Sequence, residues 1–199
     1  MLKLVDYYFT PSSPYAYMGH QRFLDLIFAT ESAVNIKPVD FGRIFAASGG
    51  LPLAKRAPQR QAYRLQELDR WRDHLGIKLN PQPKFFPVDA TLAALVILAA
   101  TKDMSSVAPG LAYDFMRAVW ADDRNIADVE TVKAIIRAKG LSLELLERAQ
   151  APETRTAYDA LTQEAIDRGV FGAPTYLFGE QMFWGQDRLD FLQRALEAK

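Results

Sequence analysis

Hydrophobic positions change their spacing twice within the first 42 residues of the chain. Residues 2–9 are rich in Val, Tyr and Phe and alternate only imperfectly, which is typical of a strand buried on both faces. After a break rich in Pro and Ser, apolar residues recur at helical spacing, and Ser13 and Pro14 suit the N-cap and the first position of that helix. Residues 34–41 predict a second strand. A crossover of this length joins parallel strands, so we expect a right-handed β–α–β unit.

The middle of the chain has the pattern of helices. Residues 60–75 place apolar side chains at helical spacing among arginines and glutamates, and Gly76 ends this predicted helix. Residues 77–88 contain three prolines and predict a loop, whereas residues 89–100 are almost wholly apolar and predict a buried helix. Four further helices are expected at residues 109–120, 129–139, 142–149 and 152–167.

The last 31 residues, 169–199, predict two strands and a final helix. The first strand follows Ala173 and Pro174, a tight turn falls at residues 179–180, and the second strand ends at Trp184. The helix begins near residues 186–187. Proline cannot donate to a sheet ladder, so Pro174 belongs at a strand start, where a cis peptide bond is also expected.

These elements predict an α/β protein with a thioredoxin-like fold. A β–α–β unit stands at one end, a β–β–α unit at the other, and an all-helical block lies between them. We expect residues 1–42 and 169–199 to form one discontinuous thioredoxin-like domain. Residues 43–168 would then form a helical insertion domain.

Composition narrows the possible functions. The 24 basic and 24 acidic residues cancel, so the chain lacks the basic character of a nucleic-acid-binding protein. The chain has no cysteine, so any sulfur chemistry needs a thiol from another molecule. The longest apolar run, residues 90–100, is too short to span a membrane, and we expect a cytoplasmic protein. His20 and His74 form no metal-ligand pattern with nearby acids, so we expect no metal.

Two motifs make the chain resemble a known family. Residues 9–17 are FTPSSPYAY and residues 169–175 are GVFGAPT, and residues 183–189, FWGQDRL, extend the likeness. The chain resembles the 2-hydroxychromene-2-carboxylate isomerases over nearly its full length. That group is related to the kappa-class glutathione transferases and the periplasmic disulfide oxidoreductases. The oxidoreductases have Cys-x-x-Cys at the first strand-to-helix corner, where this chain has SPYA at residues 13–16.

The resemblance implies that glutathione is the cofactor and Ser13 the catalytic residue. In the isomerases and kappa transferases, a serine at this position helps to hold the glutathione thiol. A helix N-terminus lowers the pKa of a thiol, because its free N–H groups and dipole favour the thiolate. Ser13 also suits a simple N-cap role, but the GAPT motif favours the catalytic interpretation.

The resemblance also implies where glutathione lies. The residue before the cis-proline, Ala173, would pair with the cysteinyl unit as an added strand edge beside Pro174. At the start of the last helix, Gln186 and Asp187 would hold the γ-glutamyl end, with N–H groups for its carboxylate and Asp187 for its ammonium group. Asp187 suits an N-cap as well.

The glycyl carboxylate of glutathione needs a cation. Alignment with the family favours Arg60, with Lys55 and Arg56 as alternatives. An aromatic substrate would stack on aromatic residues of the pocket. The candidates are Tyr15, Tyr17, Phe85, Phe86 and Trp184.

The implied reaction is reversible conjugate addition of glutathione to an electron-poor double bond, followed by isomerisation and release of the thiol. If the product keeps the thiol, the same site is that of a kappa-like transferase. The alternative from another class is a non-catalytic thioredoxin-fold binding protein. Thr10 stands where an acidic residue is common in the family, and residues 48–51, SGGL, lack a frequent glutathione-binding asparagine. These departures leave the substrate open. We expect a homodimer.

Overall fold

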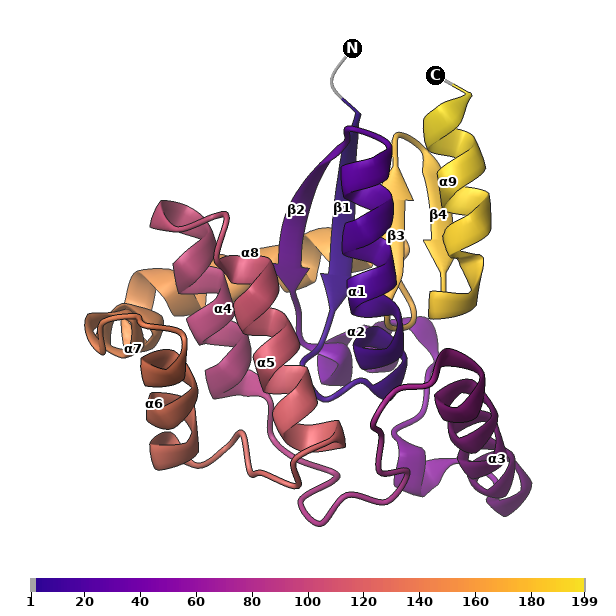
Figure 1. Cartoon of the computed structure of the whole chain (residues 1–199), viewed down its shortest axis with the longest axis horizontal. Helices are drawn as coiled ribbons and strands as arrows, with labels where there is room; N and C mark the ends of the chain where they lie inside the picture. Colours follow the sequence, from indigo (N-terminus) through magenta and orange to yellow (C-terminus); the bar gives the residue numbers. More distant parts are fainter. Residues whose placement is uncertain (1–2, 199) are drawn as a thin grey trace.

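The chain is arranged around a mixed four-stranded sheet (Figure 1). The computed structural model describes residues 3–198, so the first residue of the predicted first strand, Leu2, lies outside the described residues. The strands are β1 (Leu4–Phe9), β2 (Ala33–Pro38), β3 (Thr175–Phe178) and β4 (Gln181–Trp184), in the order β2-β1-β3-β4. β1 is parallel to β2 and antiparallel to β3, and β3 is antiparallel to β4. The predicted β–α–β and β–β–α units are therefore confirmed.

The helices that the sequence predicts with bounds agree with the structure to within a few residues at each end, and α2 was not predicted as a separate helix. Ser13 and Pro14 start the first helix as expected, and Gly76, in the left-handed conformation, ends the third. The helices are α1 (Pro14–Ala29), α2 (Phe41–Ser48), α3 (Pro58–Leu75), α4 (Thr91–Asp103), α5 (Ala108–Trp120), α6 (Val129–Ala138), α7 (Glu144–Gln150), α8 (Pro152–Asp167) and α9 (Leu189–Glu197), with 3-10 turns η1 (Leu53–Lys55) and η2 (Gln186–Arg188).

Two predicted boundaries were wrong. The second strand ends at Pro38 instead of residue 41, because Asp40 accepts hydrogen bonds from the N–H groups of Gly42 and Arg43 and so caps α2. The last α-helix begins at Leu189, because residues 186–188 form a separate 3-10 turn. The first difference adjoins the cavity described below, because Asp40 is one of its lining residues.

Strand β1 is buried on both faces, as its imperfect alternation predicts. Tyr7 and Phe9 belong to the main core beside α1, whereas Tyr8 points to a second core with residues of α2 and α8. α1 and α9 thus cover one face of the sheet, and α2 and α8 cover the other (Figure 1). This layering places the start of α1 at the end of the sheet where β1 ends.

The helical block shares its core with the sheet. The buried residues of α4 and α5 belong to the same cluster as those of β1, α1 and β3. In addition, α5 packs on α1 and α4 packs on β2. The division of the chain into two domains stays a prediction.

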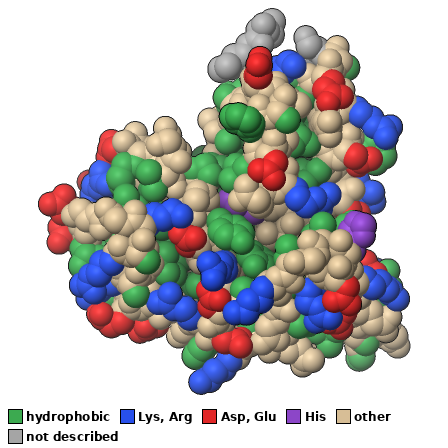
Figure 2. Space-filling model, in the orientation of Figure 1, with side chains coloured by type: hydrophobic (Ala, Val, Ile, Leu, Met, Phe, Trp, Pro, Cys, Tyr) green, Lys and Arg blue, Asp and Glu red, His purple; other side chains and the backbone are tan. Residues whose placement is uncertain are grey.

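Charged side chains of both signs are mixed on the visible surface. Figure 2 shows Lys and Arg side chains interspersed with Asp and Glu over the visible face, in line with a formal net charge of zero. Within residues 3–198, no helix is long and apolar enough to cross a membrane.

Candidate functional site

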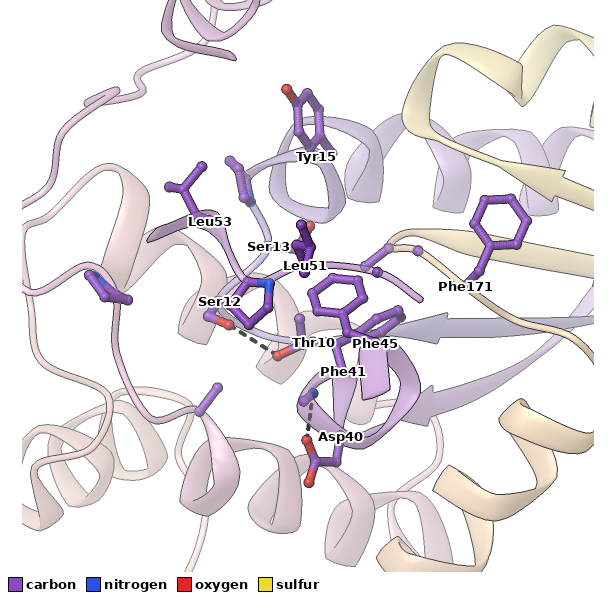
Figure 3. A pocket seen from close by; sticks show the side chains of 18 of the residues that line it. Thr10, Ser12, Ser13, Tyr15, Asp40, Phe41, Phe45, Leu51, Leu53 and Phe171 are labelled. Carbon is purple, nitrogen blue, oxygen red and sulfur yellow. Dashed lines mark hydrogen bonds between the residues drawn. The ribbon is translucent and has the colours of Figure 1, made fainter. Parts of the chain in front are cut away.

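A cavity of about 960 Å³ lies at the start of α1. Its walls come from the β1–α1 corner, α2 and the loop after it, the first turns of α3, the loop before α4, and the loop before β3. Figure 3 shows Ser13 and Tyr15 from the start of α1, with Phe41 and Phe45 of α2 and Leu51 of the following loop. The volume is at the upper end of the range for small-molecule sites. The cavity is therefore the principal candidate for a ligand site.

Ser13 combines an N-cap with a free donor. Its Oγ accepts a hydrogen bond from the N–H of Ala16 at 3.1 Å, which confirms the predicted cap of α1. The side chain is only 7% exposed, yet it lines the cavity. The bond to Ala16 uses the oxygen as acceptor, and no hydrogen bond to another described residue uses the hydroxyl proton. Capping the helix and donating to a bound group are therefore compatible roles.

The Ala173–Pro174 peptide bond is cis, as expected at this strand start. The carbonyl of Pro174 accepts from the N–H of Gly185 at 2.9 Å, which ties it to the end of β4. Ala173 lines the cavity, and within residues 3–198 no hydrogen bond joins its backbone to another residue. Ala173 therefore presents a free backbone edge to the same cavity as Ser13.

Gln186 and Asp187 follow this edge but do not line the cavity within the described chain. The Gln186 side chain is 2% exposed, and its Oε1 accepts from Arg22 of α1 at 2.7 Å. Asp187 turns back toward Gly185, whose φ is +107°: a Cβ on Gly185 would lie 2.4 Å from Asp187 Oδ1. Asp187 thus lies beside Gly185, whose N–H donates to the carbonyl of Pro174. The Gln186 side chain connects η2 to α1 through its hydrogen bond from Arg22.

Three arginines of one chain segment line the cavity. Arg60 is exposed, Arg56 donates through Nε to the carbonyl of Leu51 at 2.8 Å, and Arg64 is buried. Lys55 is not among the lining residues of the described chain. Arg64 was not predicted, although its spacing of four residues from Arg60 places both on one side of α3. Burial lowers the pKa of the Arg64 guanidinium below its ordinary value.

Two acids also line the cavity, and both hold the start of a helix. Asp40 caps α2, and Asp89 Oδ1 accepts from the N–H of Thr91 at 2.9 Å at the start of α4. Hydrogen bonds from Thr91 lower the pKa of the Asp89 carboxyl below its ordinary value. With three arginines against two acids that already accept backbone hydrogen bonds, the cavity favours anionic ligands.

The predicted aromatic residues lie in different places. Tyr15, Phe86 and Trp184 line the cavity. Trp184 is 51% exposed and meets Phe171 edge-on, with 4.8 Å between the ring centroids.

The other two predicted aromatics lie outside the cavity wall of the described chain. Tyr17 is buried, stacks on Tyr113 and donates to the carbonyl of Lys78 at 2.9 Å. Phe85 lies under the Lys84 ammonium group, 5.1 Å from its ring centroid. The cavity also includes aromatic residues that the sequence did not single out, namely Phe41, Phe45, Tyr158 and Phe171.

His20 belongs to the core. Its Nε2 lies 2.9 Å from the carbonyl of Pro109, and its Nδ1 lies 3.3 Å from the hydroxyl of Tyr7. Burial lowers the pKa of His20 to about 4, so the neutral imidazole is the stable form at neutral pH. Among residues 3–198, no group of three or more His, Cys, Asp or Glu side chains is placed to hold a metal ion.

The family model of the DsbA-like thioredoxin domain matches residues 4–197. The chain belongs to the DsbA-like thioredoxin domain family. This result confirms the fold class that the sequence predicts.

Within this DsbA-like family, individual relatives narrow the likeness. The chain is 29% identical to the 2-hydroxychromene-2-carboxylate isomerase of Sphingobium xenophagum, over 98% of this chain and 99% of that protein. It is 24% identical to glutathione S-transferase kappa 1 of Caenorhabditis elegans, over 98% and 92% of the two chains. A solved 2-hydroxychromene-2-carboxylate isomerase superposes with a TM-score of 0.82 at 26% identity, covering 98% of this chain and 95% of the other. The resemblance predicted from the motifs is confirmed.

This member of the DsbA-like family has no thiol of its own at the corner of β1 and α1. Residues 13–16 are SPYA, and the whole chain has no cysteine. A serine hydroxyl can donate to a thiolate but cannot form a disulfide. The side chains of this corner therefore cannot exchange disulfides, whereas Ser13 can donate a hydrogen bond.

Proposed function

We propose that the protein is a glutathione-dependent isomerase of the 2-hydroxychromene-2-carboxylate type. The observation that supports this most is the free hydroxyl proton of Ser13 in a cavity that also contains the free backbone edge of Ala173. A thiol-containing peptide needs both features: an extended edge for its backbone and a donor for its sulfur. The relatives named 2-hydroxychromene-2-carboxylate isomerase support the reaction type.

The proposal assigns each of the three parts of glutathione to particular residues of the chain. Ala173 pairs with the cysteinyl backbone, which directs the sulfur toward Ser13 and the start of α1. The γ-glutamyl end then extends past the lining of the cavity to η2, where Asp187 binds its ammonium group and the first N–H groups of η2 bind its carboxylate. Arg60 binds the glycyl carboxylate, because it is exposed on the cavity wall and has no ion pair within residues 3–198.

Ser13 and the helix start stabilise negative charge on sulfur. The hydroxyl donates one hydrogen bond, and the dipole of α1 adds a positive potential at the same end. When bound, glutathione supplies a thiolate that adds reversibly to an electron-poor double bond and is released after isomerisation. Tyr15, Phe86 and Trp184 offer apolar faces to the aromatic part of the substrate.

The deciding assay follows substrate and thiol together. The purified chain is mixed with 2-hydroxychromene-2-carboxylate and a small, known amount of glutathione, and the ultraviolet spectrum is recorded while free thiol is titrated. We expect many turnovers per glutathione and a constant thiol concentration. Isomerisation at the same rate without glutathione, or none with it, contradicts the proposal.

The main alternative is a kappa-like glutathione transferase, and the relative named glutathione S-transferase kappa 1 supports it. In that case the same assay consumes one thiol for each substrate molecule. A non-catalytic thioredoxin-fold binding protein would bind glutathione in calorimetry but would change neither the spectrum nor the thiol concentration.

We further propose that the protein works in the cytoplasm as a homodimer. Glutathione is the principal thiol buffer of the reducing cytosol, so a glutathione-dependent reaction belongs there. Light scattering coupled to size-exclusion chromatography measures the mass directly. A mass equal to the single-chain value of 22.4 kDa at all concentrations contradicts the dimer.

A further inference from the structure

Arg64 lines the cavity without an ion pair or a side-chain hydrogen bond to any of residues 3–198. The Arg64 side chain is 8% exposed, and its Nη2 atom is buried without a hydrogen-bond acceptor. Within residues 3–198, no carboxylate forms an ion pair with it and no hydrogen bond joins its guanidinium to another group. Burial of Nη2 removes water from part of the charge, which is costly unless an acceptor pairs with the rest of the guanidinium.

Two aromatic rings lie beside this guanidinium. Its central carbon lies 5.1 Å from the ring centroid of Phe86 and 5.6 Å from that of Trp120. These contacts support a cation, but a ring face offers no acceptor in the plane of the guanidinium N–H groups. The indole N–H of Trp120 is a second buried donor without a partner in the described chain. Trp120 is fully buried and is not among the cavity-lining residues of the described chain, so of these two residues Arg64 is the one that a ligand in the cavity can meet.

The two acids of the cavity do not supply the missing acceptor. Asp40 accepts from the start of α2 and Asp89 from the start of α4, and neither lies within ion-pair distance of Arg64. Arg60, one turn earlier on α3, is exposed and so suits the hydrated carboxylate of a peptide end. Arg64 lies beside the contacting rings of Phe86 and Trp120, whose centroids are 4.8 Å apart, and so suits a carboxylate attached to a flat apolar group.

We propose that Arg64 binds the carboxylate of the second substrate, an aromatic carboxylic acid, and orients its ring against Phe86. This inference rests on the proposed function, and it adds the residue that selects for a carboxylate. The Arg64 guanidinium nitrogens other than Nη2 are not sealed, so they can donate charge-assisted hydrogen bonds to a carboxylate in the cavity that Arg64 lines. A neutral amide of the same shape would leave the cation unpaired.

The test measures binding and does not depend on turnover. Calorimetry compares 2-hydroxybenzoate with its neutral analogue 2-hydroxybenzamide, on the unmodified chain and on Arg64→Met. We expect the unmodified chain to prefer the acid, and Arg64→Met to weaken acid binding by about 10- to 100-fold with little change for the amide. Arg64→Lys keeps the charge but lacks the planar guanidinium, so its affinity for the acid should lie between those of Arg64→Met and the unmodified chain.

The matched control is Arg70→Met. Arg70 lies on the same helix, is largely exposed and pairs with Glu67, and it is not among the cavity-lining residues of the described chain. We expect its acid binding to equal that of the unmodified chain. Circular dichroism checks that each variant is folded, and Arg64→Lys decides the test if Arg64→Met is not.

Three results would overturn the proposal: no preference for the acid over the amide in the unmodified chain, equal acid affinity in Arg64→Met, or equal loss in Arg70→Met. A folded but less stable Arg64→Met with unchanged acid affinity assigns Arg64 a purely structural role. Failure of the proposed function is a separate observation, because it is the absence of glutathione-dependent isomerisation by the unmodified chain.

Discussion

Replacing Ser13 by Ala and by Gly separates its two roles. Loss of the N-cap costs about 1 kcal/mol of unfolding free energy for Ala but only a few tenths for Gly. Loss of the hydroxyl donor to a thiolate is the same in both variants, because neither side chain can donate. A hydrogen bond to a charged group contributes about 1.5–3 kcal/mol, which corresponds to a loss of about 10- to 100-fold in kcat/KM.

The structure therefore predicts different patterns for rate and stability. Both variants should lose rate by a similar factor, whereas only Ser13→Ala should lose about 1 kcal/mol in urea denaturation. Losing the donor raises the pKa of the bound thiol, so the rising limb of the rate against pH should move to higher pH in both variants. Ser13→Thr keeps the hydroxyl and is the control.

A Ser13→Gly variant that keeps the rate of the unmodified chain, while Ser13→Ala loses it, would refute the donor role of Ser13. That pattern would follow the cap and not the donor. Unchanged pH profiles with reduced rates would also refute it, because the donor would then not act on the thiol.

Two further predictions concern the support of α1. The pKa of His20 is lowered by burial from an ordinary 6.5 to about 4, so the unfolded chain binds this proton more readily. Its contribution to stability is complete above pH 6.5 and is lost as pH falls toward 4, amounting to about 2 kcal/mol between pH 7 and 4.5. In urea denaturation, the His20→Gln variant should lose about 2 kcal/mol less unfolding free energy between pH 7 and 4.5 than the unmodified chain. Equal losses in the two proteins would contradict this role of His20. Gly19→Ala places a Cβ 2.7 Å from Gln186 Cβ, so it should destabilise by about 1–3 kcal/mol although Ala favours helices. Stabilisation in thermal unfolding would show that α1 and η2 can separate without cost.

Local signals in the sequence determined the start of α1, the end of α3 and the strand pair near the C-terminus. Ser13 with Pro14, and Gly76, act within one helical turn, so their effect does not depend on distant residues. The motif resemblance identified the family, and it placed Ser13, Arg60 and Ala173 among the residues that line the cavity.

Tertiary packing decided which side chains face the cavity. Tyr15 and Tyr17 lie two residues apart on one helix, and only the first lines the wall, because Tyr17 packs on Tyr113 of α5. Arg64 has the sequence context of a surface arginine on an amphipathic helix, yet Phe86 and Trp120 bury it. Periodicity fixes which residues share a helix face, but burial depends on which distant element covers that face, and only the folded chain sets that contact.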